Sequence, residues 1–162
     1  MALLTLLAGC SEGVHWPGVT SIRWHGPTYQ DAHAVAQREH KLTFVYFRNW
    51  YLKDCTEFEE HMLGDLEVVG ETRSLICTVL DFDWDRPLAE KWGIKMVPGF
   101  VITTPDDEVL VKQQRPISRD ELLKALRLAK EKFGGSAKPP ATLPRLWPKA
   151  QRDDSSGPGT RG

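Results

Sequence analysis

The chain has 162 residues, enough for one domain of ordinary size, and its 41% apolar and 27% charged residues are typical of a globular protein. The formal net charge is −1 and the sequence has no basic stripe, so nucleic-acid binding is not expected. No apolar run approaches the roughly 20 residues that a transmembrane helix needs. The three cysteines lack metal-ligand spacing, and the sequence therefore predicts no metal site and no cofactor.

The N-terminal segment MALLTLLAGC is apolar and ends in Leu-Ala-Gly-Cys, followed by the polar residues SEG. It resembles the lipobox of bacterial lipoproteins, in which a signal peptidase cuts before a cysteine, here Cys10, that then carries lipid. The resemblance implies an anchor and linker over residues 1–15, membrane attachment through Cys10, and a place in the bacterial cell envelope, facing the periplasm or the exterior. Only nine residues precede Cys10 and none is basic, so an unprocessed apolar N-terminus remains the alternative.

Periodicity predicts three elements in the first half of the chain. Residues 28–39 carry apolar side chains at three- and four-residue spacing, which indicates a helix. The run LTFVYF, residues 42–47, is typical of a strand that is buried on both faces. Helical periodicity resumes at about Lys53 and places Cys55 and Phe58 on the same side of a second helix.

The second half predicts a buried strand, a short helix, a second buried strand, a strand of alternating polarity and a long helix. They span residues 74–82, 87–92, 99–104, 108–114 and 118–135. Asp85 is expected to cap the short helix, which Gly93 closes. Ser118 and Glu121 are spaced as a capping box at the start of the long helix, and Gly134 is expected to end it.

These elements predict one domain over residues 16–134. An alternation of Val19, Ile22 and Trp24 allows a further short strand at its beginning. Residues 135–162 are rich in Pro, Gly, Ser and charge, which predicts a disordered tail. The order α β α β α β β α predicts an α/β sandwich, with a central mixed sheet of about four to five strands flanked by helices.

Two stretches of the chain resemble the thioredoxin family. FVYFRNWYLKDCTEFEEHML is similar to the strand, active-site turn and helix of thioredoxin-like domains, such as the C-terminal domains of transmembrane disulfide reductases, where the turn reads W-C-x-x-C. LDFDWDRPLAEKWGIKMVPGFVI resembles the segment that leads to the family's cis-proline, here Pro98. Cys55 and Pro98 lie roughly forty residues apart, as the second cysteine and the cis-proline do in the family. The resemblance covers residues 20–134 and implies a thioredoxin-like fold.

The turn departs from the family's motif at the first cysteine. Aligned without gaps, Cys55 falls on the second cysteine and Leu52 on the first, the one that attacks a partner's disulfide in the family. Tyr46 stands where thioredoxins carry a buried Asp, and Gly99 where Thr commonly follows the cis-proline. Because leucine cannot attack a disulfide, an ordinary two-cysteine cycle is not expected at this turn.

The resemblance still implies a partner-binding groove between the turn and the cis-proline loop. In the family, the residue in the position of Val97 offers its backbone to an extended partner strand, and Val97–Pro98 is expected to be cis. Trp50 and Tyr51 are the aromatic residues most expected to be exposed beside Leu52. The partner implied at this groove is a protein or peptide.

Three functions therefore remain open. The first is a binding or adaptor module that has lost its nucleophilic cysteine. The second is a single-cysteine thiol-disulfide oxidoreductase that uses Cys55, with its pKa lowered by the helix terminus and by Lys53. The third is a purely structural envelope protein. Cys77 is expected in the core, and a disulfide between Cys55 and Cys77 depends on their separation.

The stretch DFDWD also suggests a metal site, since Asp81, Asp83 and Asp85 alternate. An EF-hand loop would need Gly at Arg86 and Glu at Trp92, so that pattern is not met. A strand end followed by a helix cap explains the same residues, and no metal is predicted here.

Overall fold

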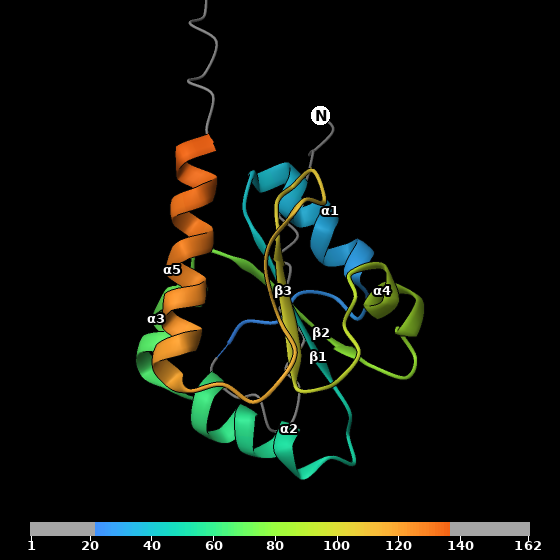
Figure 1. The fold of residues 1–162 in the computed structure, drawn as a ribbon. Helices are drawn as coiled ribbons and strands as arrows, with labels where there is room; N and C mark the ends of the chain where they lie inside the picture. The colour runs from blue at the N-terminus through green and yellow to red at the C-terminus, as the bar shows by residue number, and fades with distance from the viewer. Residues whose placement is uncertain (1–21, 137–162) are drawn as a thin grey trace, which may run out of the picture.

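Residues 22–136 are described by the computed structural model, and they form a four-stranded sheet with helices on both faces (Figure 1). The strands are β1 (Thr43–Arg48), β2 (Ile76–Asp81), β3 (Gly99–Thr103) and β4 (Val109–Gln113), in the order β2-β1-β3-β4. β1 and β2 are parallel, whereas the β1–β3 and β3–β4 pairs are antiparallel. The predicted α/β sandwich with a mixed sheet is confirmed.

The helices form two layers. α1 (Tyr29–Glu39) and α4 (Arg86–Lys91) cover one face of the sheet, while α2, α3 and α5 lie on the other side (Figure 1). α2 (Lys53–Phe58) continues into a π-helical turn, η1 (Glu59–Leu63), and α3 (Leu66–Thr72) packs against the long α5 (Arg119–Ser136).

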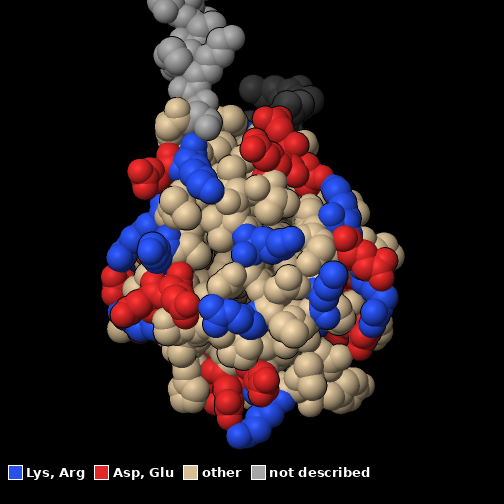
Figure 2. Space-filling model, in the orientation of Figure 1, with Lys and Arg blue, Asp and Glu red and all other residues tan. Residues whose placement is uncertain are grey.

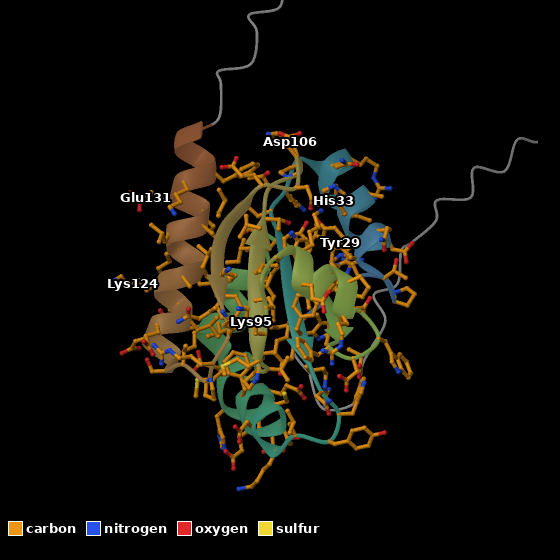
Figure 3. All side chains as sticks on the ribbon, turned by 45° about the vertical axis from the view of Figure 1, so that its right-hand side comes forward. Tyr29, His33, Lys95, Asp106, Lys124 and Glu131 are labelled. Carbon is orange, nitrogen blue, oxygen red and sulfur yellow. The ribbon has the colours of Figure 1, made fainter. Side chains whose placement is uncertain are left out.

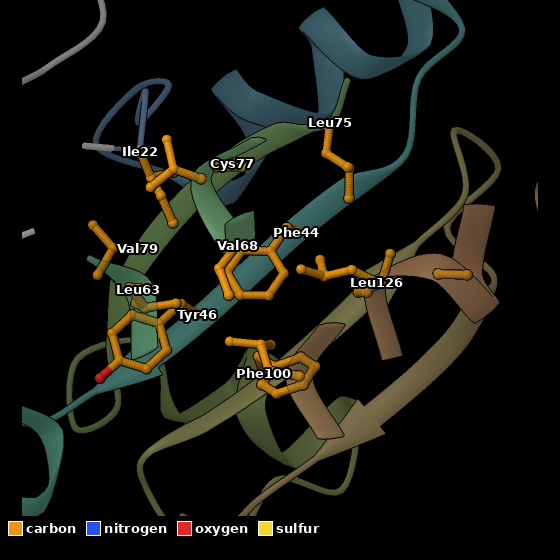
Figure 4. Packing of buried hydrophobic residues seen from close by; sticks show 14 of the residues in the cluster. Ile22, Phe44, Tyr46, Leu63, Val68, Leu75, Cys77, Val79, Phe100 and Leu126 are labelled. Carbon is orange, nitrogen blue, oxygen red and sulfur yellow. The ribbon is translucent and has the colours of Figure 1, made fainter. Parts of the chain in front are cut away.

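The strands alternate between two hydrophobic clusters. Figure 4 shows the larger one, in which Phe44, Tyr46 and Phe100 from the sheet meet Val68 of α3 and Leu126 of α5. The intervening residues of the same strands point into the second cluster, against α1 and α4. All six residues of β1 are buried, as the uninterrupted apolar run predicted. The Tyr46 hydroxyl lies at the rim of the larger cluster, which matters for the site below.

A polar network fastens α1 to the β3–β4 turn. Figure 3 shows Tyr29 and His33 side by side on α1, below the turn that carries Asp106. The Tyr29 hydroxyl donates to Asp107 Oδ1 at 2.6 Å and lies 3.1 Å from His33 Nδ1. Lys91 of α4 forms an ion pair with the same Asp107. One carboxylate thereby joins two helices to the hairpin.

α3 is the element that the sequence did not predict. It is short, with Val68, Val69 and Thr72 buried, and its sole terminal signal is Asp65, whose carboxylate accepts hydrogen bonds from the first N–H groups. Short helices are marginal by themselves. α3 is instead held by packing and by ion pairs that join its acidic side chains to α5, including one between Arg119 and Asp65 at 2.8 Å.

Smaller differences occur at the ends of elements. α5 continues through Gly134 to Ser136, so the expected stop at Gly134 is wrong. Asp85 is the N-cap residue of α4, but its side chain makes no capping hydrogen bond. The proposed N-terminal strand is reduced to one parallel bridge between Trp24 and Cys77, and Val19 lies outside the described residues.

Charged residues of both signs are interspersed on the face seen in Figure 2. In the described part of the chain, no helix is long and apolar enough to cross a membrane.

Removing the capping box should destabilise α5. The Ser118 N–H donates to the Glu121 carboxylate at 2.9 Å, and the Glu121 N–H donates to Ser118 Oγ at 3.3 Å, as predicted. We expect Ser118→Ala to lower the free energy of unfolding by about 1 kcal/mol in urea denaturation. Ser118→Asp keeps a side-chain acceptor and should remain close to the original stability; equal losses in both variants would contradict the capping role.

Candidate functional site

Three loops meet at one end of the sheet. β1 and β2 are parallel, and their last residues, Arg48 and Asp81, pair with each other. β3 runs in the opposite direction and therefore begins at the same end. The turn after β1 (residues 49–52), the loop after β2 (residues 82–85) and the loop before β3 (residues 95–98) converge there. This is where the family resemblance placed the partner groove.

Asn49 joins two of these loops. Its Nδ2 donates to Asp83 Oδ2 at 2.8 Å, and its Oδ1 accepts from the Tyr51 N–H at 2.9 Å. The Asp81 carboxylate accepts from the N–H groups of Asp83 and Trp84 at 2.9 and 3.1 Å. The two loops are thus fastened to each other without any disulfide.

Leu52 occupies the N-cap position of α2, which makes Cys55 the third residue of that helix. A leucine side chain offers no acceptor to the first N–H groups, and no side-chain capping bond forms here. Leu52 is exposed. The N-cap position of α2 therefore holds an exposed and chemically inert side chain.

Cys55 is fully buried, at 0% exposure, and its Sγ accepts a long hydrogen bond of 3.5 Å from the Asn49 N–H. Burial raises the pKa of the Cys55 thiol, and the Asn49 N–H acts against this rise. Lys53 does not activate it, because its Nζ pairs with Glu57 at 2.7 Å, so that expectation is wrong. Cys77 is also buried, its pKa is raised to about 12, and both cysteines are free.

A buried ion pair lies beneath the turn. Arg48 Nε is 3.1 Å from Glu59 Oε1, with 6% and 2% of the two side chains exposed. The Tyr46 hydroxyl donates to the same Oε1 at 3.2 Å. Burial raises the pKa of Glu59, and the guanidinium of Arg48 acts against the rise. The buried carboxylate of Glu59 thereby contacts both Arg48 and Tyr46 beneath the turn.

This pair was missed by sequence analysis. Two features of the sequence pointed toward it. Arg48 stands at the end of a strand that is buried on both faces, and Glu59 lies on the same side of its helix as Cys55. Neither signal shows that the two side chains meet, because β1 and the end of α2 approach only in the folded chain.

Arg48 also supports Trp50. The guanidinium carbon lies 3.8 Å from the centroid of the Trp50 ring, in a cation–π arrangement. Nη1 of Arg48 is buried and has no hydrogen-bond partner among residues 22–136. Trp50 remains 41% exposed. A buried cation thus holds an exposed aromatic ring in place, which lowers the entropy cost of using that ring in binding.

Exposed apolar side chains gather on the three loops. They share large size and high exposure: Trp50 41%, Tyr51 93%, Leu52 44%, Trp84 86% and Met96 54%. The first three are residues that sequence analysis selected, whereas Trp84 and Met96 were missed. Large exposed aromatic residues in one region are typical of interaction sites.

The Val97–Pro98 bond is cis, as the resemblance implied. Val97 is half-buried and Pro98 is buried. The Lys95 N–H donates to Gln114 Oε1 at 2.7 Å, which ties this loop to the segment after β4. At Gly99 a Cβ would lie 2.9 Å from the Met96 carbonyl oxygen, so the close approach of the loop favours glycine here.

Other predicted positions are not brought into this site. Cys10, the anchor and linker, and the tail after residue 136 lie outside the described residues. Within residues 22–136, no group of three or more His, Cys, Asp or Glu side chains is placed to hold a metal ion.

The sheet order, the cis-proline loop and the helix that follows β1 define a protein of the thioredoxin-like class. Solved structures agree. A thioredoxin from Thermus thermophilus is 25% identical with a TM-score of 0.65, over 74% of this chain and 95% of that one. A DsbH oxidoreductase is 14% identical with a TM-score of 0.59, over 76% and 95%. The DsbD C-terminal domain of Neisseria meningitidis is 16% identical with a TM-score of 0.51, over 60% and 90%.

These neighbours confirm the thioredoxin-like fold; by name they are a thioredoxin, an oxidoreductase and the C-terminal domain of DsbD. No protein-family model matches the chain, and no curated protein matches it in sequence.

The burial of Cys55 predicts low thiol reactivity in the native protein. After a short iodoacetamide pulse at neutral pH, peptide mapping should find Cys55 unmodified in the native protein and modified in urea, because only the exposed thiolate reacts. Leu52→Cys/Cys55→Ser is the matched control, since its new thiol would occupy an exposed position with no second cysteine beside it, and it should be modified in the native state. Rapid native labelling of Cys55 would contradict its burial.

Removing the cation from the buried pair should give a pH-dependent loss of stability. Burial already raises the folded-state pKa of Glu59, and Arg48→Met should raise it further. The Glu59 carboxyl then binds its proton more tightly in the folded state than in the unfolded state. The stability of the variant therefore falls as pH rises through the folded-state pKa of Glu59. We expect a loss of about 3–5 kcal/mol near neutral pH and a smaller loss near pH 4.5.

Urea denaturation across this pH range measures the effect. The double variant Arg48→Met/Glu59→Gln lacks the titrating group, so its loss relative to the original protein should lack the extra dependence on pH. A pH-independent loss in Arg48→Met would contradict the role of Glu59.

Proposed function

We propose that this protein is a thioredoxin-fold binding or adaptor module that has lost the nucleophilic cysteine of its active-site turn. The observation that carries the proposal is the pairing of an exposed Leu52 with a buried Cys55. Thiol-disulfide exchange needs a thiol that is both accessible and deprotonated. Cys55 meets neither requirement, because its side chain is buried and burial raises its pKa.

The binding surface consists of the exposed side chains of the three loops, with Trp50 and Tyr51 as its aromatic anchors. A partner segment would lie along the cis-proline loop, with the backbone of Val97 as its hydrogen-bonding edge. This mode of recognition, in which an extended peptide pairs with main-chain groups, uses pockets for side chains to give specificity. The partner is therefore a protein or peptide in extended conformation.

The proposed location is the bacterial cell envelope, with the chain tethered through lipid on Cys10. Its support is the apolar segment that ends in Leu-Ala-Gly-Cys, together with the fold shared with DsbH and the DsbD C-terminal domain.

The alternative is a single-cysteine thiol-disulfide oxidoreductase that uses Cys55. Insulin reduction with dithiothreitol separates the two functions. We expect the original chain and Cys55→Ser to give the same background rate, whereas Leu52→Cys, which restores two cysteines at the family's spacing, should give Cys55-dependent turnover. Cys55-dependent turnover by the original chain would overturn the adaptor proposal.

Peptide binding tests the adaptor function directly. Extended peptides selected from a random display library against the full chain should bind at least about tenfold more weakly to Trp50→Ala and Tyr51→Ala, because large aromatic residues dominate such interfaces. Leu66→Ala is the matched control, since Leu66 is 86% exposed on α3, away from the three loops. Two results would refute this surface. One is that the peptides bind Leu66→Ala as weakly as the loop variants, and the other is that they bind Trp50→Ala and Tyr51→Ala as tightly as the original chain.

A further inference from the structure

A pocket that is separate from the proposed binding surface lies at the opposite end of the sheet. It has a volume of about 250 Å³ and is bordered by the segment before α1, the loop between α1 and β1, and the loop between α3 and β2. Lys41 and Ile76 line it at the amino ends of β1 and β2, whereas the three loops of the proposed binding surface lie at their carboxyl ends.

Cationic side chains from all three segments reach this pocket. Arg23, Lys41 and Arg73 line it together with one carboxylate, Glu39. Glu39 forms ion pairs with Lys41 at 2.7 Å and with Arg38 at 3.6 Å, so its negative charge is balanced. The pocket therefore carries an excess of positive charge, contributed by residues far apart in the sequence.

Two groups in the pocket have no partner. Within the described part of the chain, the exposed Arg73 side chain makes no hydrogen bond or ion pair, and the Nδ1 atom of His25, which also lines the pocket, is buried without a hydrogen-bond partner. A buried polar atom without a partner costs free energy that a ligand can recover. The guanidinium of Arg73 has a planar fork of donors, which favours a ligand with phosphate or carboxylate oxygens.

The size and the walls of the pocket narrow the ligand class. Pockets for drug-sized ligands occupy roughly 300–1,000 Å³, so a volume of about 250 Å³ suits a smaller group. Val69, Leu75 and Ile76 provide apolar contact beside the cations. This combination fits a phosphate group that carries a short organic substituent.

We propose that this pocket binds a phosphate monoester or diester, with Arg23 and Arg73 holding the phosphate oxygens and the apolar side chains contacting its substituent. Such a phosphate can belong to a small soluble metabolite or to a phospholipid headgroup, and both present the same chemistry. The site is independent of the peptide-binding function, because it shares no residue with the three loops.

The soluble arm of the test is an NMR titration of the ¹⁵N-labelled full chain with glycerol 3-phosphate. We expect saturable shifts of the amides near Arg23, Lys41 and Arg73. Arg73→Gln should weaken binding about tenfold, and Arg23→Gln/Arg73→Gln should remove it, because each charge-assisted contact contributes on this scale. Arg115→Gln is the matched control, an exposed arginine away from the pocket, and should bind as the original chain does.

The lipid arm uses sedimentation with phosphatidylglycerol vesicles, with Cys10→Ser in every protein so that no acyl chain contributes. Binding to these vesicles that is lost in Arg23→Gln/Arg73→Gln and kept in Arg115→Gln identifies a lipid headgroup. Binding in the soluble arm alone, with the same dependence on Arg23 and Arg73, identifies a soluble phosphate. No saturable binding in either arm, or equal losses in the Arg115→Gln control, overturns the proposal, and none of these results bears on the peptide surface.

Discussion

The central strand β1 is the constraint on which the rest of this structure depends. It is buried on both faces, lies between β2 and β3, and sends alternate side chains into two hydrophobic clusters. A strand in that position cannot shift by one residue without exchanging its two apolar faces. Its register therefore fixes where the turn after Arg48 begins and where Pro98 lies beside it. Every feature of the candidate site follows from this placement.

The turn after β1 presents Leu52 to solvent and buries Cys55. Beneath them, Arg48 and Glu59 form an ion pair that Tyr46 completes with a hydrogen bond. Charges that are buried together are expensive to separate. The ion pair also holds Arg48 in place, and the guanidinium of Arg48 packs against the exposed ring of Trp50.

Much of the fold could be predicted because its signals are local. The continuous apolar run of β1, the capping box of Ser118 and Glu121, and the helix stop at Gly93, where φ is +66°, depend on neighbours within a few residues. α3 escaped prediction because it is short and its stability comes from contacts with α5 rather than from its own sequence. The end of α5 was misplaced because glycine weakens a helix without requiring it to stop.

The sequence by itself determined the thioredoxin-like order of elements, the cis-proline loop, and the absence of a cysteine at position 52. It could not determine whether Cys55 is exposed, that Arg48 meets Glu59, or that Trp84 and Met96 are exposed on loops at the same end of the sheet as Trp50 and Tyr51. Nor could it bring Arg23, Lys41 and Arg73 to one pocket. These are relations between residues distant along the chain, and no local pattern records them. Burial and charge pairing depend on which surfaces the packed sheet brings together, so only the tertiary structure decided them.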